Sequence, residues 1–489
     1  MSNLKHSLAL TFLSTNGATL VQFGVTICLA RLLSPEEIGV YSITAVLIAI
    51  AQFFRDFGVS SYLQHEKELT RDKVASAFGV MLLSSWSIAL VTYLAAPYAA
   101  AYYGHDGVAK VMRVLSLGYV FIPFGSVTHS LLTRDYRATE QAYVRVYGTT
   151  AYAVTAVGLA YAGFSYMSMP WANFVNILAT AIGYARYTPD VAKVWPSLRG
   201  WRRVANFGLG ATVGSSLTAI NNALPDLVLG KISGPHAVGV MSRAMSTTQL
   251  VNQVLGPTIS YAVLPYFSKV HHAGQDLSDV LQKSCSYLTG IMWPALICTA
   301  IFAHPLTSFL YGAQWLECAP LIGVFCIMLL AGVPFTFLGT AFMAIGRPQL
   351  ASVPTLLTIA VRGACIWLMY DGSTMSFAWA LVVGGLIMYP VQAQIQGITF
   401  GLSWSNFLAA QTKSLAVSAL CAAVAAGTAW LCRSAPSGLV ILAGGVTVPV
   451  TWLHAMKAVD HPLWSEVASM AGQKPAMQRV LKHLRLTTA

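Results

Sequence analysis

Long apolar segments separated by short polar ones run through the whole chain. A helix needs roughly 20 mostly apolar residues to cross the hydrocarbon core of a bilayer. About 14 segments meet this requirement, at approximately 8–30, 38–54, 76–96, 111–131, 146–165, 170–186, 207–230, 238–264, 285–304, 319–342, 353–370, 376–396, 412–432 and 437–456. The pattern therefore predicts an all-α, polytopic membrane protein with about 14 transmembrane helices. The boundaries of the fifth, the sixth and the last four segments are the weakest.

One polar turn occurs twice. Residues 31–42 read RLLSPEEIGVYS and residues 231–242 read KISGPHAVGVMS, so that a cation, Pro, Gly, Val and Ser recur at one offset. A second pair of motifs supports the repeat. Tyr103-Gly104 begins six residues after Pro97, and Tyr311-Gly312 begins six residues after Pro305. A chance match of a few loop residues is the alternative. The repeat predicts an N-terminal six-helix lobe (1–200), a C-terminal six-helix lobe (201–400), two additional transmembrane helices (401–456) and a cytoplasmic tail (457–489).

Composition supports this class. With 56% hydrophobic and 9% charged residues, the chain carries too little charge to cover a soluble surface of its size. If the N-terminus is cytoplasmic, 22 of the 29 Lys and Arg residues lie on the inner side and 4 on the outer side, with 3 inside spans. The positive-inside rule therefore predicts that both termini are cytoplasmic. No loop is long enough to form a basic nucleic-acid-binding domain.

Charged side chains within the spans are candidates for a functional site, because a charge at membrane depth is costly unless it is paired or hydrated. Arg113, Arg243 and Arg362 lie inside predicted spans. Each charge also has a structural alternative. Arg113 could extend its guanidinium to the interface, and Arg243 could form a salt bridge with Asp226 that only holds two helices together. Similarly, Arg55 and Asp56 could be an interfacial ion pair that anchors the second span.

Amide side chains form a second group of candidates. The pair at 221–222 precedes Pro225 and Asp226, and a proline at membrane depth frees a backbone carbonyl, which tends to mark a substrate or ion site. The amides between 249 and 253 recur at helical spacing and therefore share one face. The predicted cavity-lining residues are Asn16, Gln22, Asn221, Asn222, Gln249, Asn252 and Gln253.

Several kinds of chemistry have no sequence support. No phosphate-binding loop and no His-Glu-x-x-His motif is present, and the 8 Cys and 11 His residues do not show metal-ligand spacing. The external loops, of which 97–110 and 305–318 are the longest, are too short for a catalytic domain. We therefore expect no catalytic residue, metal or cofactor, and the chain is not expected to be an enzyme. Coupling to a proton or sodium gradient is left open.

Three stretches resemble the Wzx-type polysaccharide flippases of the multidrug/oligosaccharidyl-lipid/polysaccharide exporter superfamily. They are residues 30–42 (ARLLSPEEIGVYS), 225–231 (PDLVLGK) and 310–320 (LYGAQWLECAP). The resemblance covers residues 5–430, although the Leu-Pro before Asp226 is less usual in that family. It implies an undecaprenyl-diphosphate-linked oligosaccharide as substrate. This unit would pass from the cytoplasmic to the periplasmic leaflet of the bacterial inner membrane as two lobes alternate around a cationic cavity.

This interpretation gives roles to the candidates. A guanidinium binds phosphate oxygens in a bidentate manner, so the candidate diphosphate contacts are Arg243, Arg113, Arg362 and Arg55. Asp226 would pair with Arg243 or carry a coupling ion. Membrane lipids, a polysaccharide polymerase and the chain-length machinery are the expected partners. A monomer is expected because the repeat supplies both lobes.

Two other functions remain open. A cation-coupled multidrug antiporter of the same superfamily would have a more acidic and aromatic cavity than three intramembrane arginines and one deep aspartate indicate. A membrane glycan polymerase or ligase would need catalytic groups on a long external loop.

Overall fold

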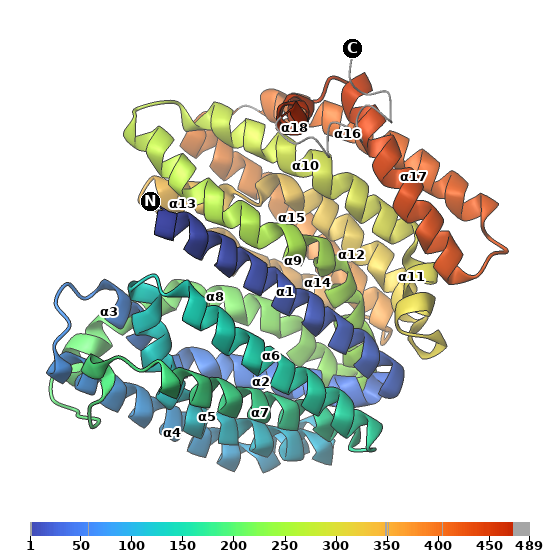
Figure 1. Ribbon diagram of the computed structural model, residues 1–489. Helices are drawn as coiled ribbons and strands as arrows, with labels where there is room; N and C mark the ends of the chain where they lie inside the picture. Colours follow the sequence, from blue (N-terminus) through green and yellow to red (C-terminus); the bar gives the residue numbers. More distant parts are fainter. Residues whose placement is uncertain (1, 57, 348–349, 351, 403, 473–489) are drawn as a thin grey trace. The chain divides into compact units, whose positions relative to one another are not determined.

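The computed structural model describes residues 2–56, 58–347, 350, 352–402 and 404–472 (Figure 1). The described residues form helices and no strand. Each predicted apolar segment coincides with helical structure, in order α1 (Ser2–Leu32), α2 (Pro35–Asp56), α4 (Arg71–Tyr103), α5 (Asp106–Arg134), α6 (Ala138–Tyr161), α7 (Ser168–Arg186), α8 (Trp201–Ile232), α9 (Gly234–His272), α10 (Leu277–Ile301), α12 (Cys318–Gly332) with α13 (Leu338–Ala344), α14 (Ser352–Met369), α15 (Thr374–Phe400), α16 (Trp404–Leu431) and α17 (Ser437–Ala458). The predicted all-α, polytopic fold is confirmed.

Short helices join some of these. They are α3 (Val59–His65), α11 (Ala303–Leu310) and α18 (Pro462–Gly472). The predicted span at 319–342 is interrupted by a 3₁₀ turn, Val333–Phe335. Pro334 lies in this turn, and a proline cannot donate the backbone hydrogen bond that a continuous helix requires. Within the described residues, seven helices are long and apolar enough to cross a membrane by length and composition, and Gly17–Leu32 and Val353–Met369 are shorter apolar helices.

The chain divides into two compact units, Met1–Ser242 and Arg243–Ala489. The division falls within α9. In the first unit α4, α5, α7 and α6 are successive neighbours, α1 lies along α6, and α8 packs on α2, α3 and α4 (Figure 1). In the second unit α10 packs on α12 and α16, α15 lies between α12 and α14, and α17 packs on α16. The lobe boundaries inferred from the sequence repeat stay a prediction.

The first repeated turn is set by its own sequence. Ser34 and Glu37 form a capping box at the start of α2, with Ser34 N donating to Glu37 Oε2 (2.7 Å) and Glu37 N donating to Ser34 Oγ (3.3 Å). Pro35 is the first residue of α2, where a proline costs no helical hydrogen bond. Ser165 also donates its hydroxyl to Glu37, which ties the turn to the segment between α6 and α7.

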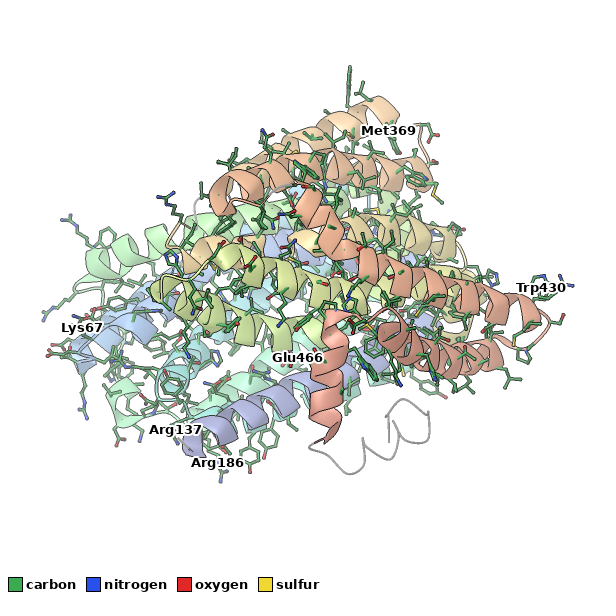
Figure 2. All side chains as sticks on the ribbon, turned by 90° about the horizontal axis from the view of Figure 1, so that it is seen from above. Lys67, Arg137, Arg186, Met369, Trp430 and Glu466 are labelled. Atoms are coloured by element: carbon green, nitrogen blue, oxygen red, sulfur yellow. The ribbon has the colours of Figure 1, made fainter. Side chains whose placement is uncertain are left out.

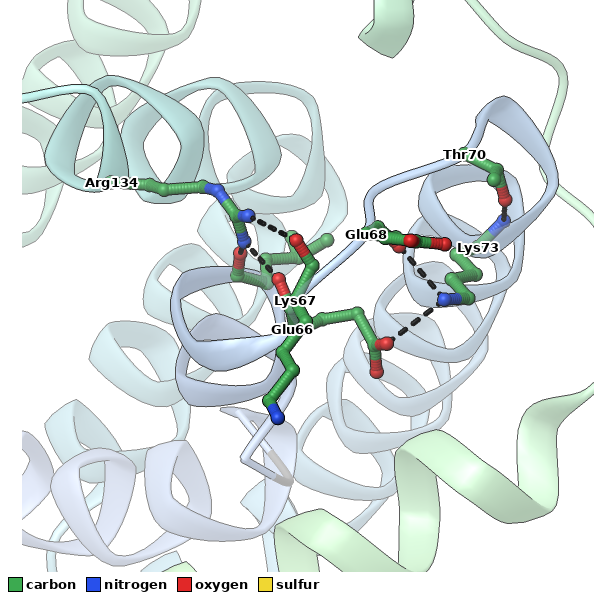
Figure 3. A network of polar contacts seen from close by, with 7 residues as sticks. Glu66, Lys67, Glu68, Thr70, Lys73 and Arg134 are labelled. Atoms are coloured by element: carbon green, nitrogen blue, oxygen red, sulfur yellow. Dashed lines mark hydrogen bonds and ion pairs between the residues drawn. The ribbon is translucent and has the colours of Figure 1, made fainter.

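The end of the first unit that lies away from the repeated turn is basic. Lys67, Arg137 and Arg186 lie toward one end of the first unit (Figure 2). There the Arg134 guanidinium donates to the carbonyl oxygens of Leu63, Glu66 and Lys67 (Figure 3). These carbonyls belong to the last turn of α3 and the residues after it, where a helix lacks intrahelical partners. We call this the basic end; it is the end that the charge distribution predicts to be cytoplasmic.

In the second unit, a buried polar cluster ties the C-terminal helices to the bundle. His461, between α17 and α18, is 1% exposed, and its Nε2 lies 2.9 Å from Ser414 Oγ of α16. Leu463 N donates to His461 Nδ1 (3.1 Å), so Nδ1 is the acceptor and Nε2 carries the proton. Thr289 of α10 donates its hydroxyl to Gln411 Oε1 (2.7 Å). The cluster therefore requires a neutral imidazole.

This requirement predicts acid sensitivity. Burial, followed by the Lys413 ammonium, lowers the pKa of His461 from its ordinary value near 6.5 to about 4. Between these two values the unfolded chain binds a proton that the folded chain does not, so stability falls as the pH falls from about 6.5 towards 4. We expect this group to cost roughly 1–2 kcal/mol of stability by pH 5. The apparent Tm of the purified protein should drop on acidification, and the drop should be smaller in His461→Gln.

The control is His454→Gln. His454 is exposed on α17, where its Nδ1 lies 2.8 Å from the Val450 carbonyl oxygen. The His454→Gln substitution should leave the acid-induced drop in Tm unchanged. An equal effect of the two substitutions would show that His461 is not the group that titrates.

Candidate functional site

The two repeated turns lie against each other within the first unit. A Cβ atom placed on Gly39 would lie 2.5 Å from the Pro235 carbonyl carbon, and one placed on Gly239 would lie 2.7 Å from the Pro35 carbonyl carbon. Real Cβ contacts are almost never shorter than 3.0 Å. Neither glycine can therefore be replaced without separating the helix starts. The contact is reciprocal, as expected for two copies of one element related by a pseudo-two-fold axis.

The next turn of the same two helices continues this contact. Ser42 Oγ of α2 donates to Ser242 Oγ of α9 at 3.4 Å, and both serines occupy the same position in the repeat. Lys231, at the end of α8, donates to the Tyr102 carbonyl oxygen (2.6 Å) and lies 4.4 Å from the centre of the Tyr102 ring. We call the contact of Pro35, Gly39 and Ser42 with Pro235, Gly239 and Ser242 the helix crossing. It lies at the end of the first unit opposite the basic end.

Arg55 is buried near the other end of α2. Arg55 is 5% exposed, and its guanidinium carbon lies 5.9 Å from the centre of the Tyr119 ring on α5. The Tyr119 hydroxyl donates to the Ile48 carbonyl oxygen (2.6 Å), which fixes the ring beside α2. The ring holds the cation without neutralising its charge.

Arg243 has a similar setting in the second unit. The residue is 7% exposed, and its guanidinium carbon lies 5.2 Å from the centre of the Tyr311 ring and 5.1 Å from that of the Trp315 ring. Both rings are buried, at 1% and 0% exposure. The hydroxyls of Tyr311 and Thr247 lie 3.0 Å apart, so Tyr311 is fixed in turn by α9. We call Tyr311 and Trp315 the aromatic pair.

The other two arginine candidates differ. Arg362 of α14 is half-buried against α15, where Gly384 leaves room for it, and its Nη2 lies 3.6 Å from Met328 Sδ. Arg113 is exposed, with its guanidinium carbon 5.5 Å from the centre of the Tyr93 ring, which is itself 45% exposed. An exposed arginine beside an exposed tyrosine is the arrangement expected of a side chain that reaches the interface.

The acidic and amide candidates are less defined. Asp226 is half-buried in α8, and its Oδ1 is buried without a hydrogen-bond partner among the described residues. Its predicted pairing with Arg243 would join the two units and stays a prediction. Gln22 and Asn222 are exposed, whereas Asn221 and Gln249 are half-buried. The side chains of Asn16, Asp56, Asn252 and Gln253 lie outside the described part of the chain.

Within each unit, the structure brings together residues that are far apart in the sequence. The repeated turns meet at the helix crossing. Arg55 lies near one aromatic ring of α5, and Arg243 lies near two rings in the segment after α11. The rings of Tyr119 and Trp315 were not singled out as site residues from the sequence. Trp315 lies in the 310–320 stretch that resembles the flippases, and the repeat pairs Tyr311 with Tyr103, so a signal for the aromatic pair was present.

Comparison with known proteins identifies the family. A family model described as "Polysaccharide biosynthesis protein" matches residues 28–320, which is more than half of the chain. The chain belongs to this family. The matched residues include the helix crossing, Arg55, Arg243 and the aromatic pair.

Individual relatives agree with the polysaccharide biosynthesis family. The chain is 25% identical to the succinoglycan biosynthesis transport protein ExoT of Rhizobium meliloti (strain 1021) over 82% of this chain and 80% of that protein. It is 23% identical to the lipopolysaccharide biosynthesis protein WzxC of Escherichia coli (strain K12) over 68% of each. The predicted resemblance is confirmed at the level of the polysaccharide biosynthesis family.

Solved structures show the same fold. The lipid II flippase MurJ in an inward closed conformation aligns with a TM-score of 0.72 and 12% identity, covering 92% of this chain and 98% of that one. A multidrug resistance MATE family transporter of the MOP superfamily, in an inward-facing conformation, aligns with a TM-score of 0.64 and 15% identity, covering 78% and 95%. The predicted fold is confirmed.

Proposed function

We propose that this protein transfers an undecaprenyl-diphosphate-linked oligosaccharide from the cytoplasmic to the periplasmic leaflet of a bacterial inner membrane, for export of an envelope or extracellular polysaccharide. The observation that carries the proposal is that two arginines are buried beside aromatic rings, Arg55 beside Tyr119 and Arg243 beside the aromatic pair. The names of the relatives, a succinoglycan transport protein among them, support it. They are named as transport or biosynthesis proteins and not as catalysts, in agreement with the expectation that the chain is not an enzyme.

The chemistry of such a substrate suits these arginines. A diphosphate carries about two negative charges, which cannot enter hydrocarbon without compensation. A guanidinium over an aromatic ring keeps its full positive charge, because the ring supplies only a quadrupole. Its donors can therefore pair with phosphate oxygens when these arrive.

The helix crossing fits the second requirement, a barrier that can open. Alternating access needs one end of the pathway to be closed while the other is open. Backbone packed against backbone through two glycines makes a tight closure. The six residues that form it are uncharged, and the hydrogen bond between Ser42 and Ser242 is long, at 3.4 Å. Such a contact can be broken at modest cost. We infer that the crossing closes the periplasmic end and opens to release the glycan.

Asp226 is the proposed coupling residue. Its Oδ1 is buried without a hydrogen-bond partner among the described residues, and such an atom gains most from a bound proton or cation. Sodium or proton coupling through Asp226 therefore belongs to the proposal. So do the cytoplasmic position of both termini, a monomeric state, and cooperation with a polysaccharide polymerase and chain-length machinery.

A direct assay tests the function. Purified protein in liposomes should expose an undecaprenyl-diphosphate oligosaccharide to an externally added glycan-modifying enzyme, and Arg55→Gln should reduce the initial rate about 10-fold or more. The reason is that α2 contains no second Lys or Arg that could take over the role of this buried cation. Lys67→Gln, which removes an exposed charge at the basic end, is the control and should keep the wild-type rate.

Other outcomes would overturn the proposal. A wild-type protein that moves none of several such lipids, but expels a cationic dye along a sodium or proton gradient, would be a drug antiporter. Equal rates in wild type and Arg55→Gln would remove Arg55 from the substrate path.

A further inference from the structure

The segment between α7 and α8 is built onto the surface of α4. Ser197 N donates to the Ala75 carbonyl oxygen (3.0 Å), and Ser76 donates its hydroxyl to the Arg199 carbonyl oxygen. Gly79 makes this close approach possible, because a Cβ atom there would lie 2.7 Å from the Ser197 carbonyl carbon. Pro196, Ser197 and Leu198 are therefore held in a fixed place on the first turns of α4, at the basic end.

A surface crevice of about 500 Å³ opens beside this contact. Its volume is in the range of pockets that hold small ligands. The lining is nearly all apolar, and the α4 side chains Leu83, Trp86 and Leu90 are 56%, 47% and 60% exposed. The lining residues are Gly79, Leu82, Leu83, Trp86, Ser87, Leu90, Pro196, Ser197 and Leu198. Since α4 is one of the most apolar candidate spans, this lining suits an acyl chain.

The rim of the crevice is cationic and aromatic. Residues 190–203 contain four cations and one acid, a net charge of +3. Lys193 pairs with the acid, Asp190, at 2.8 Å. Arg199 and Arg202 are exposed, and among the described residues neither forms an ion pair with a carboxylate.

The tryptophans of this segment place it at the membrane surface. Trp195 is 91% exposed, and the half-exposed Trp201 has the Arg202 guanidinium carbon 5.8 Å from a ring centre. Tryptophans concentrate at the level of the headgroups, and arginines beside them attract anionic lipids. The crevice thus runs from a headgroup-level cationic rim along the apolar surface of α4.

We propose that this crevice is a binding site for one anionic phospholipid of the bilayer. An acyl chain lies in the crevice along Leu83, Trp86 and Leu90. The phosphate lies at the rim, where Arg199 and Arg202 supply the charge. The charge of the rim selects an anionic headgroup over a zwitterionic one, and the fixed Pro196–Leu198 segment supplies the wall. The proposal depends only on α4 spanning the membrane, and it is independent of the transported substrate.

Photo-cross-linking tests this site directly. The full chain is placed in nanodiscs that contain a diazirine-labelled phosphatidylglycerol or a phosphatidylcholine with the same labelled acyl chain. The labelled peptides are then identified by mass spectrometry. We expect phosphatidylglycerol to label residues 79–90 and 196–198 about 10-fold more than phosphatidylcholine, because each interfacial arginine strengthens attraction to an anionic lipid several-fold. Raising the salt concentration should weaken the preference.

Matched variants identify the rim. The double variant Arg199→Gln/Arg202→Gln should bring phosphatidylglycerol labelling down to the phosphatidylcholine level. Arg433→Gln is the control, because Arg433 is also exposed and lies 5.6 Å from the centre of the Trp430 ring, but it does not adjoin this crevice. It should leave the labelling unchanged.

Three results would overturn the proposal. They are equal labelling of these residues by the two lipids, unchanged labelling in the double variant, and preferential labelling by a diazirine undecaprenyl phosphate added in competition. The last result would assign the crevice to the transported lipid.

Discussion

Replacing Gly39 by alanine is expected to reduce glycan-lipid transfer at least 10-fold while the protein still folds. The added methyl group would lie 2.5 Å from the Pro235 carbonyl carbon and 3.0 Å from Gly239 N, whereas ordinary contact begins near 3.4 Å. Both atoms are backbone, and the Pro235 carbonyl oxygen would lie closer still, so the starts of α2 and α9 must move apart. Overpacking of this kind costs about 1–3 kcal/mol. That cost falls on the closed crossing alone and shifts the population towards the open one.

The control is Gly158→Ala in α6. Gly158 has nothing within 4 Å of an added Cβ, and alanine is the better helix former, so transfer should be unchanged and the Tm equal or higher. Gly239→Ala should reproduce the effect of Gly39→Ala. The double variant should cost little more than either single one, because both act on the same contact. A fully active Gly39→Ala protein would exclude the crossing from the transport cycle.

A cross-link separates movement from folding. In a protein without its native cysteines, Ser42→Cys/Ser242→Cys places two thiols where the hydroxyl oxygens are 3.4 Å apart. Oxidation should stop transfer, and a reductant should restore it, if the crossing must open in each cycle. Continued transfer in the oxidised protein would show that the crossing is a fixed joint.

The hydrophobic pattern was sufficient to predict the helices. Few folds other than a membrane-spanning helix bundle contain many apolar segments long enough to cross a bilayer. The spans could therefore be predicted even where their ends were uncertain. The repeated turn was equally informative, because a glycine that must lie against a partner helix is constrained at both copies. Pro334 shows a limit of predicting helices from hydropathy. It interrupts the predicted span at 319–342 because proline lacks a backbone N–H, and a hydropathy pattern contains no information on this property.

The partners of the buried arginines could not be predicted in this way. Arg55 and Tyr119 lie on different helices, and Tyr311 directly follows α11, whereas Arg243 lies in α9. The residues of each pair are more than 60 positions apart in the sequence. Periodicity shows which face of a helix is polar, but it does not identify the side chain that covers that face. From the sequence, a carboxylate partner for Arg243 was the natural expectation, since an ion pair is the familiar way to bury a charge. Within its own unit, Arg243 also lies over two rings, which the sequence did not indicate, and its pairing with Asp226 stays a prediction.

The repeat makes the position of Arg243 informative. At the offset that relates the two turns, the first copy has Ile43, which is fully buried and lies beside Gly230, as does the Tyr103 ring. Tyr103 corresponds to Tyr311. The second copy therefore has a cation and a second ring, Trp315, in a place where the first copy is packed with an aliphatic side chain. An arginine is an expensive substitute for isoleucine at a buried position, which favours a functional reason for it.

Trp315→Leu is accordingly expected to lower glycan-lipid transfer about 10-fold, and Arg243→Lys by at least as much. A desolvated cation–π contact contributes about 2 kcal/mol, and a tenfold change in rate corresponds to about 1.4 kcal/mol. Lysine keeps the charge but loses the planar fork that lies against the rings and binds phosphate in a bidentate manner. Tyr311→Phe keeps the ring face and removes only the hydroxyl near Thr247, so it should cost less than about threefold.

The dependence of the initial rate on lipid concentration distinguishes binding from packing. If the aromatic pair positions Arg243 for the diphosphate, Trp315→Leu and Arg243→Lys should both raise KM, and the double variant should be no worse than Arg243→Lys alone. Arg433→Lys, at an exposed Arg–Trp contact of similar distance, should change nothing. A loss of Tm in Trp315→Leu with an unchanged KM would assign the pair to folding alone. The buried charge of Arg243 would then need another ligand.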